Sequence, residues 1–271
     1  MLQPNFFNSL FVFPILNVLM LFYKLFLSLH LPGAFGFSLI ALTVAVRLLV
    51  HPFFRQQLES SKKMADLKPH LDRLNLKHKN NPKKLQEEQL KLYQQAGINP
   101  AGSCLFMIIQ FPIFIALYQT LSLLLVNGQK VITDINRVVY LPWLKINAVD
   151  PWFFGLNLAL TPAKAKLWVY YLIPVITGVL QYFQTKTMTP AMAAAPAEKN
   201  ADASKKDGKA NQTGDFQKAM NTQMRYVFPL MIAYFAYTLP IGLSLYWNIF
   251  SIFGILQYRQ MNAGSAKKPA N

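Results

Sequence analysis

One arginine lies inside an apolar stretch of the chain, and it is the side chain best placed to do chemistry. Arg47 is the single charge between Ala34 and Phe54. An arginine near the centre of a membrane helix costs about 2.5–3.5 kcal/mol on insertion scales. All 11 Asp and Glu residues fall in polar segments, so no carboxylate in an apolar stretch can pair with it. Arg47 must therefore snorkel to the near surface, find backbone and side-chain oxygens, or sit in water.

Polar side chains in the apolar stretches could supply the surroundings that Arg47 needs. Thr43 lies one helical turn before Arg47, on the same face. Further polar positions occur in the later apolar stretches, at Gln110, Gln181, Gln184, Ser244, Asn248 and Ser251. A polar cavity open to the cytoplasm would satisfy all of these groups at once. The alternative is that they only join helices by hydrogen bonds.

The sequence offers no motif for catalysis, metal binding or a cofactor. Nucleophile-elbow, zinc-protease and nucleotide-binding patterns are absent. The single cysteine, Cys104, excludes an internal disulfide and a cysteine-based zinc site. A proton-coupled transporter would require acidic residues within its spans, and none lies in an apolar stretch. We therefore predict that the protein is not an enzyme. A small-solute transporter or channel is kept as an alternative function.

The composition indicates which elements must position Arg47. The chain of 271 residues is 53% hydrophobic and only 14% charged, yet its net charge is +16. Soluble domains carry about 25% charged residues, so this composition argues against a soluble enzyme. A nucleic-acid-binding protein could be as basic but would not need apolar runs of about 20 residues, which are long enough to cross a bilayer. We predict an all-α polytopic membrane protein with a five-transmembrane-helix bundle.

The apolar runs and the polar loops divide the chain into segments. The first apolar run is interrupted by Pro14 and has a narrow polar stripe that includes Lys24, which favours a helix in the membrane interface over a sixth span. Leu239-Pro240-Ile241-Gly242 predicts a turn within the last run. The predicted segments are an interfacial helix (1–33), spans at 34–54, 101–126, 167–187, 222–239 and 241–260, a cytoplasmic helical hairpin (55–100), an external loop (127–166), a disordered linker (188–221) and a tail (261–271).

The loop charges predict the orientation of the chain. The segment Arg55–Gly97 carries ten Lys and Arg residues, whereas Asn127–Lys166 carries five. Cytoplasmic loops are the ones enriched in Lys and Arg. We therefore expect a multi-pass protein of the bacterial plasma (inner) membrane, with its N-terminus outside and its C-terminus in the cytoplasm.

Four stretches of the sequence resemble a known family. They are FGFSLIALTVAVRLLVHPFFRQQLESSKKM, GINPAGSCLFMIIQFPIFIALYQTL, YLPWLKINAVDPWFFGLNL and FPLMIAYFAYTLPIGLSLYWNIFSIFGILQYRQ. Their order and spacing resemble the YidC/Oxa/Alb membrane protein insertases over about residues 6–260. The resemblance is to a short form without the large periplasmic domain.

The resemblance implies a hydrophilic groove that opens to the cytoplasm and to lipid. It places Arg47, Thr43, Gln181 and Trp247 in that groove, to which the polar inventory adds Gln110, Ser244 and Asn248. The implied function is that of a membrane protein insertase and chaperone. Such a protein passes the hydrophilic flanks of nascent membrane proteins through the groove and releases their hydrophobic segments into lipid. The implied partners are nascent membrane proteins and lipid, with the ribosome and the Sec translocon left open and no specific nucleic acid.

Overall fold

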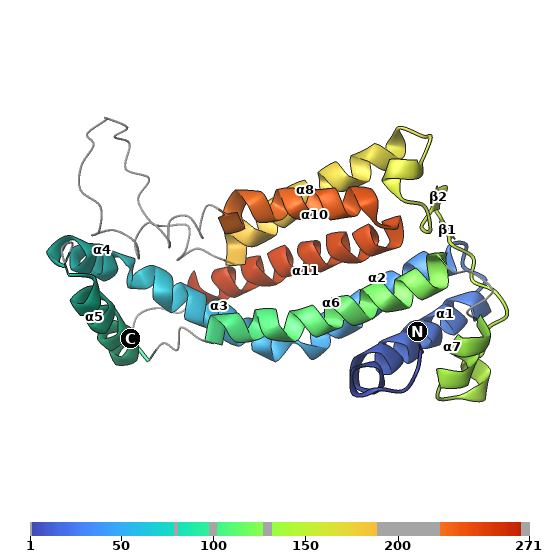
Figure 1. The fold of residues 1–271 in the computed structure, drawn as a ribbon, viewed down its shortest axis with the longest axis horizontal. Coiled ribbons are helices and arrows are strands. Elements are labelled where there is room, and N and C mark those ends of the chain that lie inside the picture. The colour runs from blue at the N-terminus through green and yellow to red at the C-terminus, as the bar shows by residue number, and fades with distance from the viewer. Residues whose placement is uncertain (1, 79–80, 98–101, 127–131, 189–222, 267–271) are drawn as a thin grey trace.

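The computed structural model describes residues 2–78, 81–97, 102–126, 132–188 and 223–266 (Figure 1). Their secondary structure is almost entirely helical. The helices are α1 (Phe13–Ser28, after a π-helical turn at Asn8–Val12), α2 (Ala34–Leu49), α3 (His51–Asp66), α4 (Lys68–Lys77), α5 (Pro82–Gln95), α6 (Gly102–Val126), α7 (Ile132–Val138), α8 (Val169–Met188), α10 (Phe228–Thr238, after a π-helical turn at Gln223–Val227) and α11 (Ile241–Ala266). The sheet within this described part pairs β1 (Trp152–Phe153) with β2 (Leu156–Asn157) in antiparallel fashion.

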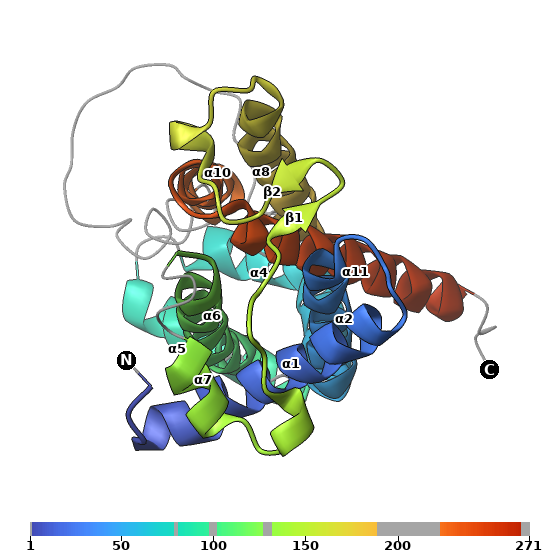
Figure 2. The ribbon, with the colours of Figure 1, turned by 90° about the vertical axis from the view of Figure 1, so that its right-hand side faces the viewer.

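The helices form an elongated molecule with different elements at its two ends. Helices α4 and α5 pack together at one end, whereas α7 and the β1–β2 hairpin lie at the other (Figure 1). Between these ends, α8 packs against α10 and α11, and α2 packs against α1 and α11 (Figure 2). Helix α6 contacts α1, α3 and α11. Helices α2, α11 and α8 therefore form a continuous wall along the molecule.

Proline residues account for two breaks in the long helical runs. Helix α2 ends at Leu49 and α3 begins at His51, with a bend of 58° between them. Pro52 follows at the second position of α3, where its missing N–H removes a hydrogen bond that would continue α2. Pro240 separates α10 from α11, and the turn is fixed by the Ile241 amide, which donates to the Leu160 carbonyl (3.0 Å).

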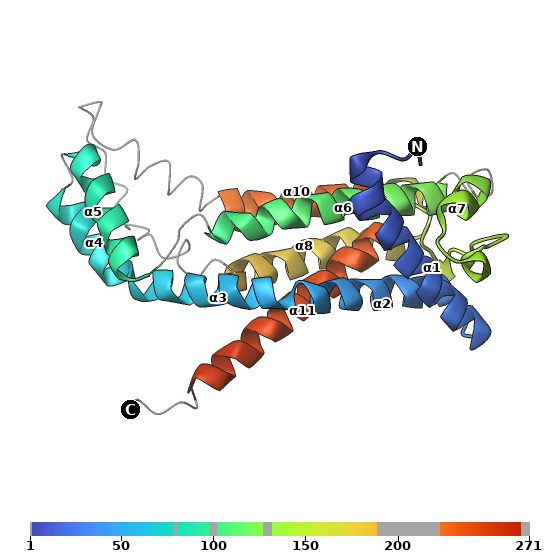
Figure 3. The ribbon, with the colours of Figure 1, turned by 90° about the horizontal axis from the view of Figure 1, so that it is seen from below.

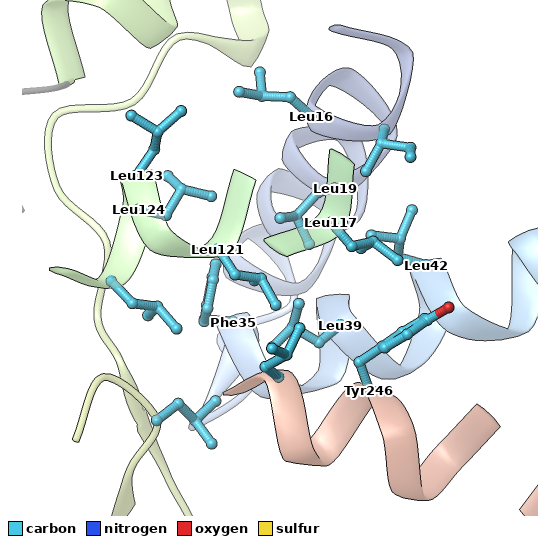
Figure 4. Close-up of a cluster of buried hydrophobic side chains, with 14 of the residues drawn as sticks. Leu16, Leu19, Phe35, Leu39, Leu42, Leu117, Leu121, Leu123, Leu124 and Tyr246 are labelled. Carbon is cyan, nitrogen blue, oxygen red and sulfur yellow. The ribbon is translucent and has the colours of Figure 1, made fainter. Parts of the chain in front are cut away.

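The buried apolar core joins α1, α2, α6 and α11 (Figure 4). These helices meet through leucine side chains and two aromatic rings that are at most 5% exposed: Leu16, Leu19, Phe35, Leu39, Leu42, Leu117, Leu121, Leu123, Leu124 and Tyr246. In a lipid environment such a cluster stabilises the fold by close packing, because lipid tails are as apolar as leucine. The core fixes α2 against α11, the two helices that carry most of the candidate site.

The outward faces of the helices are apolar, as a membrane protein requires. Helices α8 and α10 expose large hydrophobic side chains at Leu172, Val175, Ile176, Val179, Phe183, Leu230, Met231 and Tyr234. By length and composition, Asn8–Ser28 and Ile241–Gln260 could each cross a membrane, as could the bent pair α2–α3 if it counts as one span. The chain is therefore a helical, multi-pass membrane protein, and the division into five spans stays a prediction.

The N-terminal helix α1 lies at an angle to the helices that it contacts. Helix α1 runs obliquely to α2 and α6, which lie nearly parallel to each other (Figure 3). It is tied to the loop after α7 by Asn17, whose Nδ2 donates to the Val138 carbonyl (3.2 Å) and whose Oδ1 accepts from the Tyr140 amide (2.6 Å). The length of Asn8–Ser28 suits a span, and its oblique course suits the interface.

Candidate functional site

Arg47 lies where α2, α3 and α11 meet, in the last turn of α2. Its Nη2 donates to the Phe250 carbonyl of α11 (2.5 Å). The guanidinium carbon lies 3.4 Å from the centre of the Phe250 ring and 5.2 Å from the centre of the Phe54 ring. The last turn of a helix favours a cation, because the helix dipole places partial negative charge there. The side chain is 0% exposed, so it is completely enclosed.

The enclosed guanidinium keeps unused hydrogen-bond donors. Among the described residues, Arg47 Nε and Nη1 have no hydrogen-bond partner. The ion pairs of the described residues involve other arginines and lysines, as at Arg55–Glu59. A buried donor without a partner costs about 1–3 kcal/mol, and more when it is charged. The site is therefore poised to receive hydrogen-bond acceptors.

The face of α11 that includes Gly254 carries small and polar side chains. Ser244, Asn248, Ser251 and Gly254 recur at intervals of three or four residues, which places them on one side of the helix. Ser244 Oγ and Asn248 Oδ1 are buried and have no partner among the described residues. A Cβ added to Gly254 would lie 2.8 Å from Arg47 Nη2. The absence of a side chain at this position makes room for the guanidinium.

Helix α8 contributes Gln184 to the site. Gln184 is 3% exposed, and its Oε1 accepts a hydrogen bond from Ser251 Oγ (2.6 Å). Its Nε2 would lie 3.2 Å from a Cβ at Gly254, so the amide nitrogen and the Arg47 guanidinium approach the same point of α11. With its oxygen occupied, Gln184 presents donors on the side of Arg47. The donors of both residues suit a guest that offers oxygen atoms.

The remaining predicted residues take different positions. Thr43 is fully buried on α2, and its hydroxyl donates to the Leu39 carbonyl (2.6 Å), so it bonds within its own helix. Trp247 is stacked on Phe114 of α6, with ring centres 5.1 Å apart. Gln181 is half-buried on α8, and its Nε2 lies 3.5 Å from Thr185 Oγ1. The side chain of Gln110 in α6 lies outside the described residues.

The structure thus brings Arg47 of α2 together with Phe250 and Gly254 of α11, and Gln184 of α8 approaches the same point. It differs from the expectation of an open, water-filled cavity, because Arg47 and Ser244 are each 0% exposed. The physical reason is that Phe250 covers the guanidinium and supplies its carbonyl acceptor. Sequence reasoning missed this role of Phe250, because the sequence does not show which carbonyl and ring lie against Arg47. It also missed Gly254, although its spacing from Ser251 and Asn248 places it on their face.

A second contact closes the site on the side of α3. Gln257 Nε2 and His51 Nδ1 lie 3.0 Å apart, which links the far part of α11 to the first residue of α3. His51 stands at the bend after α2, four residues beyond Arg47. The bent pair α2–α3 and α11 are therefore joined at Arg47 and again at His51.

Comparison with known proteins adds independent evidence. The family model described as "60Kd inner membrane protein" matches residues 26–268. The chain is 29% identical over 249 residues to the inner membrane protein ALBINO3 of Arabidopsis thaliana chloroplasts, covering 89% of the chain and 49% of that relative. It is 29% identical over 245 residues to the membrane protein insertase YidC of Chlamydia trachomatis (90% and 27%), and 28% identical over 270 residues to the membrane protein insertase MisCA of Bacillus subtilis (98% and 83%). The chain therefore spans about half, or less, of the length of the first two relatives.

Proposed function

Because the chain belongs to the 60Kd inner membrane protein family, we propose that it is a membrane protein insertase and chaperone. Two observations support this proposal. Relatives named membrane protein insertases match it over most of its length, and the family model confirms the resemblance seen in the motifs around Arg47 and Pro240. The observation that carries the mechanism is the enclosed Arg47, whose Nε and Nη1 have no partner among the described residues.

Arg47 is the receptor for the polar flank of a substrate in this proposal. A carboxylate or a backbone carbonyl of the flank takes up the free Nε–H and Nη1–H, and the amide of Gln184 donates to the same group. Hydrogen bonds to a charged group contribute about 1.5–3 kcal/mol each, and they strengthen where water is excluded. Acidic flanks therefore gain most from the site.

The enclosed arrangement is the resting state of the groove. The Phe250 carbonyl and ring occupy the place that a substrate takes, which limits the cost of an arginine buried without a carboxylate. Opening requires α11 to shift relative to α2, and with it the contact between Gln257 and His51. The bend between α2 and α3 is the point at which such a shift is absorbed.

Transfer to lipid uses the exposed apolar faces of α8 and α10. A hydrophobic segment slides along these faces while its polar flank rests near Arg47. This arrangement shortens the distance that the flank must travel through the hydrocarbon core of the membrane. Each unsatisfied backbone group in that core costs several kcal/mol. The membrane potential contributes about 2.3 kcal/mol per charge for each 100 mV. The substrate's own transfer into lipid supplies the remaining driving force, so no cofactor is needed.

The topology in this proposal has five spans, with the N-terminus outside and the C-terminus in the cytoplasm. Helices α4 and α5 then form a cytoplasmic hairpin, and the β1–β2 hairpin lies on the external side. The charge difference between the segments Arg55–Gly97 and Asn127–Lys166 supports this orientation.

Insertion into reconstituted vesicles tests the proposed function directly. A small single-span protein with an acidic external segment is synthesised in the presence of proteoliposomes with or without this chain, and protease protection reports its insertion. We expect protection of the external segment only where the chain is present. Equal protection in empty liposomes, or a flux of small solutes without any substrate protein, would argue for a different function.

A further inference from the structure

The β1–β2 hairpin presents an apolar ring in an unfavourable backbone conformation. Its two-residue turn consists of Phe154 and Gly155, with φ values of 46° and 79°. Turns of this kind favour Asn-Gly, because both central residues need positive φ. A bulky residue there costs about 1–3 kcal/mol, yet the Phe154 side chain is 78% exposed. The Phe37 and Phe153 rings contact the Phe154 ring on one side only, and packing within the chain leaves most of this ring exposed.

The base of the hairpin is attached firmly to the start of α2. The Phe153 ring fills the space beside two glycines: a Cβ on Gly33 would lie 2.8 Å from this ring, and one on Gly36 would overlap it. Phe37 of α2 packs edge-on against the rings of both Phe153 and Phe154, at 5.2 and 5.9 Å between centres. The tip is thus a rigid extension of the N-terminal end of α2.

The β1–β2 hairpin lies at the end of the molecule opposite α4 and α5 (Figure 1), and segments that precede and follow it carry other amphipathic side chains. Three of the four tryptophans of the chain lie here and are at least half exposed, namely Trp143, Trp152 and Trp168. Exposed lysines accompany them at Lys145, Lys164 and Lys166. Tryptophan is enriched at membrane–water interfaces, and lysine attracts anionic headgroups.

We propose that the β1–β2 hairpin is a lipid anchor whose Trp152 and Phe154 side chains enter the boundary between headgroups and acyl chains. Lipid is the occupant because large apolar side chains are exposed both on the hairpin and at Leu167 and Trp168, just before α8, and because the neighbouring lysines complement lipid phosphates. In the proposed topology this boundary belongs to the outer leaflet.

The anchor fixes the depth of the insertase site. Arg47 follows Ala34, the first residue of α2, by 13 residues, so it lies roughly 20 Å along the helix at 1.5 Å per residue. Because Phe153 locks the hairpin to Gly33 and Gly36, holding the tip in the interface holds Arg47 at a set depth. This role goes beyond substrate binding and is measurable without any substrate.

Tryptophan fluorescence in vesicles tests the anchor. The full chain carries Trp152 as its sole tryptophan, with Trp143, Trp168 and Trp247 replaced by phenylalanine, and is reconstituted with lipids brominated near the headgroup end of the acyl chain. We expect these lipids to quench Trp152 while aqueous iodide does not. Quenching by iodide alone would place the hairpin in water, and quenching by neither would show that protein covers it; each result overturns the proposal.

A substitution at the tip separates anchoring from packing. Phe154→Asn relieves the backbone strain, so we expect the melting temperature in detergent to stay equal or to rise. In vesicles the same variant should lose the lipid quenching of Trp152 and shift its emission to the red. Leu76→Asn is the matched control, since Leu76 on α4 is 79% exposed at the other end of the molecule and should leave Trp152 unchanged. A lowered melting temperature with full lipid quenching would show that Phe154 serves packing only.

Discussion

Replacing Gly254 with alanine should displace the Arg47 guanidinium and thereby reveal how tightly α11 holds it. The new Cβ would lie 2.8 Å from Arg47 Nη2 and 3.2 Å from Gln184 Nε2, so at least one of these side chains must move. Moving the guanidinium weakens its bond to the Phe250 carbonyl, which is worth about 1.5–3 kcal/mol for a charged donor. Alanine also gains about 1 kcal/mol over glycine in a helix interior. The variant should therefore lose about 0.5–2 kcal/mol of stability overall.

A double-mutant cycle isolates this effect. In an Arg47→Ala background the clash with the guanidinium disappears and only the 3.2 Å approach to Gln184 Nε2 remains, so Gly254→Ala should be neutral or stabilising by about 1 kcal/mol. Thermal unfolding of the four variants in lipid nanodiscs measures the coupling, which we expect to be about 1.5–3 kcal/mol. Gly178→Ala is the matched control, because a Cβ there would lie 2.9 Å from Ala233 Cβ, where α8 meets α10. Additive effects of Gly254→Ala and Arg47→Ala would refute the arrangement described around Arg47.

Two further predictions concern the enclosed state and the orientation of Gln184. A cysteine at Thr43, in a chain with Cys104→Ser, should react slowly with an impermeant thiol reagent at rest and faster when a stalled substrate opens the groove; equal rates would contradict a closed resting state. Ser251→Ala should free the Gln184 amide oxygen to turn toward Arg47, costing about 0.5–1.5 kcal/mol of stability, and should lower insertion of acidic more than neutral substrates; equal loss for both would assign Ser251 a purely structural role.

Much of the fold follows from patterns that sequence carries directly. Long apolar runs without acids require helices in a membrane, and Pro52 and Pro240 accompany the two breaks in them. Arg47 stands out because a charge in such a run is costly whatever surrounds it. These inferences depend on local chemistry alone, so they need no knowledge of how the helices pack.

The details of the site depend on packing between distant segments and could not be predicted in the same way. The choice between Gln181 and Gln184 rests on the rotation of α8 against α11, which the pairing of Gln184 with Ser251 reveals. The carbonyl and ring that cover Arg47 belong to Phe250, which lies 203 residues away in the sequence. The sequence of an apolar run does not indicate which face of its helix meets a neighbouring helix, or which helix that neighbour is.

The groove proposal depends most directly on Arg47, and one insertion measurement tests it. Proteoliposomes containing Arg47→Ala, Arg47→Lys or the control Arg55→Ala, which removes an exposed arginine paired with Glu59, are compared at equal reconstituted amounts. We predict that Arg47→Ala strongly impairs insertion of a single-span substrate with an acidic external segment, that Arg47→Lys restores part of it, and that Arg55→Ala leaves it unchanged. Full insertion of the acidic substrate by Arg47→Ala would contradict the proposal that Arg47 receives the translocating flank.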